Sequence, residues 1–275
     1  YVPSNNKALD SKQFQDFEQQ GVTFVPFNYP ILLRIFVQFQ RLPIKFLQSI
    51  APSFLLPHSL KELVKKMDMV VSLGGDMYTY EGRLPTWILT LDKLAIDSNV
   101  PIYLVSSSLS DFSEVNGYPA HLSKHFKQFT GIAVREVVSF DIAKDKLGLK
   151  KVKLMPDIAF SLSQEQVDLS SFWPKEAKNG VVGINLSPLV EKLAENRNVK
   201  SPKLAVRHFI QKLIEEHDFS VLLIPHVAGL DGATGNNDYL FLKDIVCELG
   251  DYSGRLAICP NQLNAPETKY AIANC

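Results

Sequence analysis

An arginine beside a glutamate is the pair in this chain best suited to hold an anion and move a proton. Arg135 and Glu136 stand in VREVVS, where the apolar run 131–134 gives way to a helical pattern. A guanidinium can bind a carboxylate or phosphate through two parallel hydrogen bonds, and a carboxyl group can act as acid or base. A salt-bridged helix start is the alternative, since acids favour the first helical turn.

A histidine near the C-terminal end of the chain is the second candidate for proton transfer. His226 follows the apolar run SVLLIP, and a glycine-rich stretch leads from it to Asp238 at the start of a helical pattern. A histidine at the end of a strand suits proton transfer or phosphate binding, but a buried histidine bonded to the loop fits the same pattern. Asp238 is either a substrate ligand or an N-cap. Asn185 ends another strand-like run, GINLS, and is a further candidate substrate ligand.

Two adjacent glycines, Gly74 and Gly75, follow the apolar run MVVSL. They predict that the strand ends in a turn with positive φ, whose backbone N–H groups face an anion or a sugar, or in a plain strand-to-loop turn. Asp76, Tyr78 and Glu81 are then expected to supply polar contacts to the ligand.

A run of three serines, Ser106, Ser107 and Ser108, is interpreted as part of a hydroxyl-rich loop that leaves the strand 101–106. Serine hydroxyls can donate to phosphate or sugar oxygens, and they can equally cap the following turn. Asp157, after the strand 151–155 and a proline, is expected to cap a turn and help to set a hinge.

Short apolar runs alternate with helical patterns along the chain, which predicts βα units. Strands are expected at residues 22–27, 69–73, 101–106, 131–134, 151–155, 181–187, 220–225 and 256–260. Helices are expected near residues 11–20, 59–66, 86–98, 119–128, 137–147, 201–217, 237–250 and 267–275. Consecutive apolar residues within several strands favour parallel sheets with helices on both faces. Ser201 and Pro202 supply an N-cap and a first-turn proline for the helix over 201–217.

A length of 275 residues favours two domains. The polar stretch 161–180 lacks periodicity and is interpreted as a linker, so an N-terminal α/β domain is expected over 1–165 and a C-terminal one over 178–275. Ligands of open α/β sheets bind outside the carboxyl ends of the strands. The site is therefore expected in a cleft between the two domains.

The composition excludes several classes of partner. Lys plus Arg and Asp plus Glu number 29 each, so no net field draws the chain to nucleic acid. Three cysteines near the C-terminus match neither a zinc site nor a disulfide framework, which favours a reduced, cytoplasmic location. No residues have metal-ligand spacing, and neither a P-loop nor a serine-hydrolase motif occurs, so neither a metal nor a cofactor is expected.

The most apolar window, residues 29–57, is interrupted by Arg34, Arg41, Pro43 and Lys45, so it is not expected to span a bilayer. Its pattern is typical of an amphipathic helix and turn that cover a sheet. A basic segment that rests on a membrane surface is the alternative.

Five stretches of the chain, taken together in their order, resemble the polysaccharide pyruvyl transferase family. They are VVSLGGDMYTYEG, VPIYLVSSSLSDFSE, IAVREVVSFDIAKDKLGLKKVKLMPDIAFSL, VVGINLSPLV and VLLIPHV…NNDYLFLKDI. Val-Arg-Glu followed by Pro-Asp-x-Ala-Phe is the most specific part. The resemblance implies a GT-B-like protein of two Rossmann-like domains that moves the pyruvyl group of phosphoenolpyruvate onto a sugar as a ketal. The serines replace the family's Gly-x-Ser-x-Gly-Pro, and its Arg-x-His motif would follow residue 275, so we expect a longer chain.

The resemblance also implies roles and partners. Arg135 becomes the leading ligand for the donor's carboxylate or phosphate, Glu136 and His226 the candidates for proton transfer, and residues 74–76 the point where substrate approaches the backbone. The expected partners are phosphoenolpyruvate and a saccharide or lipid-linked oligosaccharide of a cell-surface or exopolysaccharide, with peripheral membrane contact. A nucleotide-sugar glycosyltransferase and a non-catalytic saccharide-binding relative are the alternatives.

Overall fold

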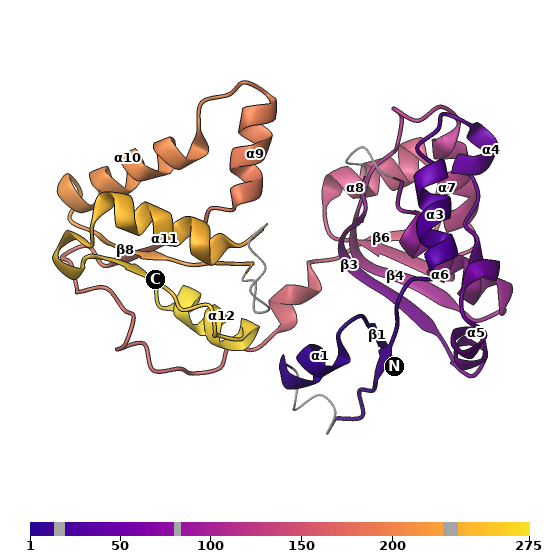
Figure 1. The fold of residues 1–275 in the computed structure, drawn as a ribbon, viewed down its shortest axis with the longest axis horizontal. Helices are drawn as coiled ribbons and strands as arrows, with labels where there is room; N and C mark the ends of the chain where they lie inside the picture. Colours follow the sequence, from indigo (N-terminus) through magenta and orange to yellow (C-terminus); the bar gives the residue numbers. More distant parts are fainter. Residues whose placement is uncertain (14–19, 80–83, 228–235) are drawn as a thin grey trace. The chain divides into compact units, whose positions relative to one another are not determined.

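The computed structural model describes residues 1–13, 20–79, 84–227 and 236–275, which form a mixed α/β protein with parallel sheets (Figure 1). The chain divides into two compact units, residues 1–161 and 162–275. The predicted helix near 11–20 falls largely outside the described residues. Among the helices in the described ranges, none combines the length and the apolar character that crossing a bilayer requires.

The first unit contains a four-stranded sheet in the order β3-β4-β5-β6 and a separate pair, β1-β2. The strands are β1 Val2–Ser4, β2 Phe24–Pro26, β3 Val70–Tyr78, β4 Ile102–Leu109, β5 Gly131–Val134 and β6 Val152–Leu154. Every pair is parallel, so the carboxyl ends of β3 to β6 lie at one edge of their sheet. Strands that follow one another in sequence are neighbours in this sheet, as short right-handed βα crossovers favour.

Helices and turns connect these strands. The helices are α1 Lys7–Gln13, α3 Ile31–Phe39, α4 Lys45–Gln48, α5 His58–Val64, α6 Thr86–Asp97, α7 Tyr118–Phe126 and α8 Val137–Asp141. The helix predicted over 137–147 is present, but its second half, Ile142–Lys146, is a π-helical turn. Short 3₁₀ turns occupy Ser53–Leu55 and Ile158–Ser161.

The first sheet packs its helices mainly on one face. Leu104 of β4 is buried with Leu122 and Phe126 of α7, whereas Val71 and Leu73 of β3 are 43% and 55% exposed. The prediction of helices on both faces is therefore wrong for this sheet. Consecutive apolar residues in β3 do not distinguish a strand covered on both faces from one whose second face stays partly open.

The second unit contains the parallel sheet β7-β8-β9 with helices around it. Its elements are β7 Val181–Ile184, α9 Pro188–Asn196, α10 Pro202–Glu215, β8 Ser220–Leu223, α11 Asp238–Leu249, a 3₁₀ turn Tyr252–Gly254, β9 Leu256–Ile258 and α12 Ala265–Ala273. Val221 and Leu223 of β8 belong to one buried cluster and Leu222 to another, so both faces of this strand are covered, as predicted.

The segment interpreted as a linker packs on the second unit. Leu169, Phe172 and Trp173 are partly buried against the cluster that contains Leu222. Ser220 Oγ also donates to the carbonyl of Lys175 at 2.5 Å. This polar stretch therefore covers part of the second sheet, although it lacks secondary structure of its own.

The signal at the start of α10 is confirmed, and the same signal marks a helix that was not predicted. Ser201 Oγ accepts from the backbone N–H of Leu204 at 3.3 Å, and Pro202 begins the helix. α9 begins in the same way, with Ser187 as N-cap and Pro188 as first residue. The Ser-Pro step at 187 is therefore a local signal for the start of α9 that was not used in the prediction.

Candidate active site

The guanidinium of Arg135 is the centre of a polar cluster at the carboxyl edge of the first sheet. Its Nε donates to Ser108 Oγ at 2.8 Å, its Nη1 to Asp157 Oδ2 at 2.7 Å and its Nη2 to Asp76 Oδ1 at 2.5 Å. These partners come from β4, from the segment after β6 and from β3, while Arg135 itself follows β5. One side chain therefore connects the ends of all four strands.

The sheet order explains why these residues meet. Asp157 lies 22 positions after Arg135 and Asp76 lies 59 positions before it, and only the parallel order β3-β4-β5-β6 brings them to one edge. Asp157 was expected to cap a turn, which it does by accepting from Ala159 N at 2.9 Å. Its ion pair with Arg135 was not predicted, since the sequence does not reveal which strands are neighbours.

Arg135 is held firmly but remains in contact with solvent. Its side chain is 26% exposed, that of Asp157 29% and that of Asp76 65%. The hydrogen bond with Asp157 is the largest effect that raises the pKa of Arg135. The backbone N–H of Ala159, followed by Arg135, lowers the pKa of Asp157. Within the described residues, three of the five guanidinium N–H groups have a partner in the protein, which leaves two for a ligand.

The two glycines lie within β3, which corrects the prediction that the strand ends before them. β3 continues to Tyr78 and pairs Gly75 with Ser107 and Tyr78 with Leu109, so it carries one extra residue between these pairs. Gly74 and Gly75 have φ of 39° and 72°. The positive φ that was predicted therefore serves an irregular strand rather than a terminal turn.

β4 has an irregularity at the same level. Val105 pairs with Ala133 and Ser107 with Val134, so Ser106 is an extra residue on β4, and its φ is 60°. A Cβ added to Gly74 would lie 3.3 Å from the carbonyl oxygen of Ser106. Glycine at position 74 therefore lets the two irregular strands approach, and positive φ at a serine is the kind of strain found at functional sites.

The three serines lie in β4 rather than in the predicted loop, and their side chains are buried. Ser106 Oγ accepts from Ile158 N at 3.0 Å, and Ser107 Oγ donates to the carbonyl of Gly75 at 3.2 Å. Ser108 Oγ is the partner of Arg135. These hydroxyls thus bind the strand ends to one another, and the loop prediction failed because small polar residues continue a strand wherever its neighbour provides partners.

Glu136 lies beside the cluster without pairing directly with Arg135, whose ion pairs are with Asp76 and Asp157. Ser139 Oγ donates to Glu136 Oε1 at 2.9 Å and accepts from Leu109 N at 2.8 Å. Hydrogen bonds from Ser108 and then Ser139 lower the pKa of Glu136. The exposed Glu136 is therefore a carboxylate at neutral pH, which suits a base and not an acid.

Tyr78 was expected to contact the ligand, and this prediction is wrong. Its ring is fully buried, and its hydroxyl donates to Asp92 Oδ2 at 2.8 Å and shares a hydrogen bond with Ser72 Oγ at 2.8 Å. His125 Nε2 lies 3.1 Å from the same Asp92 oxygen. Burial raises the pKa values of Tyr78 and Asp92. This network fixes the end of β3 from inside the core, while Glu81 lies outside the described residues.

The second unit has its own polar cluster, at the carboxyl end of β8. Asp238 Oδ2 accepts from the backbone N–H groups of His226 at 3.1 Å and Val227 at 3.0 Å. Asn185 Nδ2 donates to the same oxygen at 3.4 Å and to the carbonyl of Ile224 at 2.8 Å. The predicted residues Asn185, His226 and Asp238 therefore lie together, while the stretch 228–235 between the last two is not among the described residues.

Asp238 and His226 differ in how they meet solvent. Asp238 is 1% exposed, and within the described residues its Oδ1 has no hydrogen-bond partner. The helix N-cap is Asn237, whose side chain accepts from Leu240 N, so Asp238 is the first helical residue rather than the cap. The imidazole of His226 belongs to an exposed residue, which removes the interpretation as a buried histidine.

Both sheets of this protein gather polar groups at the carboxyl ends of their parallel strands, which is where open α/β proteins bind their ligands. The family model described as polysaccharide pyruvyl transferase matches residues 17–275, nearly the whole chain. The protein belongs to this family, and it is therefore a transferase with a saccharide acceptor. A search among curated proteins finds none that matches the chain.

Proposed function

We propose that the protein transfers the pyruvyl group of phosphoenolpyruvate to a sugar of a cell-surface polysaccharide or exopolysaccharide and forms a ketal. The observation that carries this proposal is the Arg135 cluster, a partly exposed guanidinium that three hydrogen bonds hold at the sheet edge of a chain that belongs to the pyruvyl transferase family. A planar cation in this position suits a donor that carries a carboxylate and a phosphate.

The reaction requires one proton to be added and two to be removed. A sugar hydroxyl adds to C2 of phosphoenolpyruvate as C3 receives a proton, phosphate then leaves with the electrons of the C2–O bond, and a second hydroxyl attacks C2 to close the ketal. Each hydroxyl gives up its proton to a base. Glu136, a carboxylate held by Ser108 and Ser139, suits this role, and His226 remains the candidate for the proton delivered to C3.

The charge at the sheet edge determines how an anionic donor would bind there. One cation, Arg135, faces the carboxylates of Asp76 and Asp157. An ion pair as exposed as that of Asp76 is weak, so the donor's carboxylate replaces Asp76 while Asp157 keeps the guanidinium in place. Asp76 then becomes free to accept a hydrogen bond from a sugar hydroxyl.

The proposal includes a wider setting. The two units are Rossmann-like domains of a GT-B-like enzyme that works in the cytoplasm. The acceptor is a saccharide or a lipid-linked oligosaccharide, which the enzyme meets by peripheral contact with the membrane. Asp238 positions His226 by accepting from its backbone N–H, and Asn185 supports this turn by donating to Asp238 and to the carbonyl of Ile224.

The test is incubation of the full chain with phosphoenolpyruvate and a panel of glycans, with mass spectrometry for the added pyruvyl group and an assay for released phosphate. We expect phosphate release only when an acceptor is present. Phosphate release without a pyruvylated product, or no release with any glycan, would contradict the proposal.

Two variants of the cluster sharpen the test. Asp76→Asn removes the exposed competitor of the donor, so the KM for phosphoenolpyruvate should fall. Asp157→Asn loosens Arg135, so the same KM should rise. A KM that rises equally in both variants would show that the donor does not replace Asp76.

A further inference from the structure

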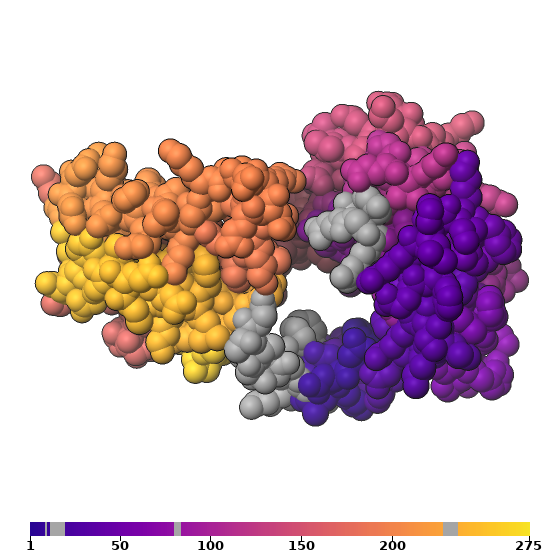
Figure 2. Space-filling view, turned by 45° about the horizontal axis from the view of Figure 1, so that its top comes forward, coloured from indigo at the N-terminus to yellow at the C-terminus, as the bar shows by residue number. Residues whose placement is uncertain are grey.

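The part of the first unit built from α3, α4 and the following turn carries large apolar side chains on its outside. Each of them is 46 to 75% exposed, and they are Ile31, Leu32, Ile35, Phe39, Leu42, Ile44, Phe46 and Phe54. Soluble monomers scatter such residues singly, and a concentration of them marks an interaction surface. We call this set the α3–α4 face. Figure 2 shows this part of the chain, in dark violet, at the surface of the first unit.

α3 is apolar on two opposite sides. Leu33 is fully buried, and Val37, one turn later, packs on the same cluster. Ile31, Ile35 and Phe39 follow at i, i+4 and i+8 and are exposed. A helix that is apolar on both sides normally has both sides covered. The outward stripe therefore predicts a partner that removes it from water.

The charge around the α3–α4 face identifies that partner. Arg34, Arg41 and Lys45 are exposed among its apolar residues. No Asp or Glu occurs between positions 18 and 62, although the whole chain has equal numbers of acidic and basic residues. A second copy docked through the same face would bring these cations together, which disfavours a two-fold dimer. Apolar and basic side chains without acids suit an anionic lipid surface.

The face is fixed in shape by one buried amide. Gln40 is 3% exposed, and its Nε2 donates to the carbonyls of Leu47 at 2.7 Å and Ile50 at 3.0 Å. Thr86 Oγ1 of α6 donates to its Oε1. These hydrogen bonds attach the turn after α3 to the core, so Lys45 and Phe46 are held at the surface before any partner arrives.

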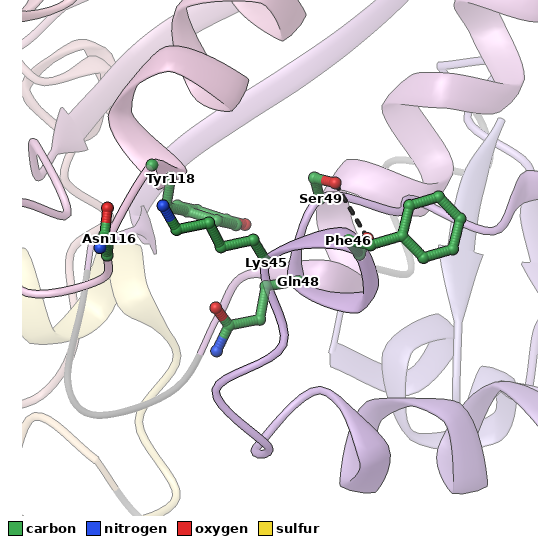
Figure 3. A pocket seen from close by; sticks show the side chains of 7 residues that line it. Lys45, Phe46, Gln48, Ser49, Asn116 and Tyr118 are labelled. Carbon is green, nitrogen blue, oxygen red and sulfur yellow. Dashed lines mark hydrogen bonds between the residues drawn. The ribbon is translucent and has the colours of Figure 1, made fainter.

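A small pocket adjoins the face. It has a volume of about 300 Å³ and is lined by Lys45, Gln48, Ser49 and Asn116, with Tyr118 as its aromatic wall. Figure 3 shows the Lys45 amine on the same side as Asn116 and Tyr118, while the ring of Phe46 points away from them. An ammonium, two amides and a hydroxyl suit the phosphate and polar head of a lipid.

We propose that the α3–α4 face docks the protein on an anionic lipid bilayer. Its apolar residues enter the boundary between headgroups and acyl chains, Arg34, Arg41 and Lys45 contact lipid phosphates, and the pocket beside Lys45 receives a headgroup. The biological reason for this docking rests on the proposed function, because a lipid-linked acceptor is presented at a bilayer surface.

The first test measures charge. The purified full chain, without substrates, is floated with vesicles of phosphatidylcholine alone or of phosphatidylcholine and phosphatidylglycerol in equal parts. Binding is expected only to the anionic vesicles and should weaken with salt. Each basic residue near such a surface strengthens binding about fivefold, so combined Arg34→Glu, Arg41→Glu and Lys45→Glu should weaken it by on the order of 10²-fold or more.

A matched control makes the same charge change elsewhere on the first unit, with Lys146→Glu, Lys150→Glu and Lys151→Glu. These lysines are exposed, and none belongs to the α3–α4 face. Equal loss of binding in both triple variants would reduce the effect to net charge and overturn the proposal. Equal binding to neutral and anionic vesicles, or no binding to either, would also overturn it.

The second test measures the apolar contribution. Phe39→Ser with Phe46→Ser should weaken vesicle binding at least about tenfold, because each ring loses its burial in the interface. Leu204→Ser with Phe209→Ser, two residues of α10 that are each 52% exposed, should leave binding unchanged. Light scattering without vesicles identifies the rival outcome. A dimer that Phe39→Ser with Phe46→Ser dissociates would assign the face to self-association and overturn lipid docking.

Transfer to a water-soluble saccharide separates the two proposals. Variants of the α3–α4 face should keep this activity while they lose vesicle binding. Vesicle binding by a protein that transfers no pyruvyl group would contradict the proposed function alone, and transfer by a protein that ignores vesicles would contradict the docking alone.

Discussion

The carboxyl edges of the two sheets both gather charged side chains, but they use them in opposite ways. In the first unit a cation, Arg135, lies between two carboxylates and remains 26% exposed. In the second unit a carboxylate, Asp238, is 1% exposed and accepts from two backbone N–H groups. The first arrangement leaves donors that a ligand can reach, whereas the second holds a turn in place. Solvent access distinguishes a binding group from a positioning group at the same place in an α/β fold.

The largest effect is expected at the carboxyl edge of the first sheet, which we call the open edge because Arg135 remains in contact with solvent there. Arg135→Ala should lower pyruvyl transfer by about 10² to 10³-fold, because it removes a fixed charge from the proposed donor site. The melting temperature should change little, since ion pairs with this exposure contribute about 1 kcal/mol or less. Steady-state kinetics measures the loss of activity, and thermal unfolding measures the change in melting temperature.

Arg135→Lys is the control for charge alone. A lysine keeps the charge but cannot donate to Ser108, Asp157 and Asp76 at once, so most of the activity should stay lost. Full activity in Arg135→Ala would remove this residue from the site.

At the carboxyl edge of the second sheet, where Asp238 is buried, a substitution should lower stability strongly. Asp238→Ala removes the acceptor of three hydrogen bonds in a buried place, so the free energy of unfolding should fall by about 3 kcal/mol. Urea denaturation measures this loss. Asp244→Ala, at an exposed position of the same helix, should change stability by less than about 0.5 kcal/mol. If the two variants were equally stable, Asp238 would not be a positioning residue.

The irregular strands at the open edge provide a smaller contrast. Gly75→Ala should cost about 1 kcal/mol, because an L-residue resists its φ of 72° although the space around it is open. Gly74→Ala should cost about 2 kcal/mol, since its Cβ would also lie 3.3 Å from the carbonyl oxygen of Ser106. Chemical denaturation of both variants checks the order. Equal costs would mean that the two strands adjust to the added methyl group.

The smallest expected effect is a dependence on acid. The pKa values of Asp157 and Glu136 are lowered in the folded protein, so each contributes stability that is present above the ordinary carboxyl pKa of about 4 and is lost as the pH falls through the folded value. Asp157→Asn should therefore reduce the fall in melting temperature below about pH 4. Asp145→Asn, an exposed control in the same unit, should leave that fall as it is. If the melting temperature of Asp157→Asn falls with pH as it does in the unmodified protein, the Asp157 carboxylate does not stabilise this edge of the sheet.

Much of the fold was predictable because local signals agree with it. The apolar run GIAV is β5 without any change of limits, and the Ser-Pro step at 201 marks the start of α10. β3 and β4 are longer than predicted because glycines and serines remain in the ladder when a neighbouring strand supplies hydrogen bonds. Such pairing depends on strand order, which local sequence does not reveal.

The candidate site was predictable in its members but not in its connections. Arg135, Asp76 and Ser108 were all singled out, and the structure brings them into contact. The pairing of Arg135 with Asp157 depends on β5 and β6 being neighbours, so no local pattern indicated it. Tyr78 was misassigned because the strand was predicted to end before it, whereas β3 continues to this residue and its ring lies in the core, where Asp92 provides a partner.

A single side chain that joins four strand ends also constrains how this protein can diverge. Replacing Arg135 by a neutral residue would cost little stability, but it would leave Asp76 and Asp157 without their cation and the sheet edge negative, so this edge could hold an anion again only if at least one of those acids changed as well. Relatives that lack the arginine should therefore also lack one of the two acids. Positions 76, 135 and 157 would then be inherited as a set, although they lie far apart in the chain.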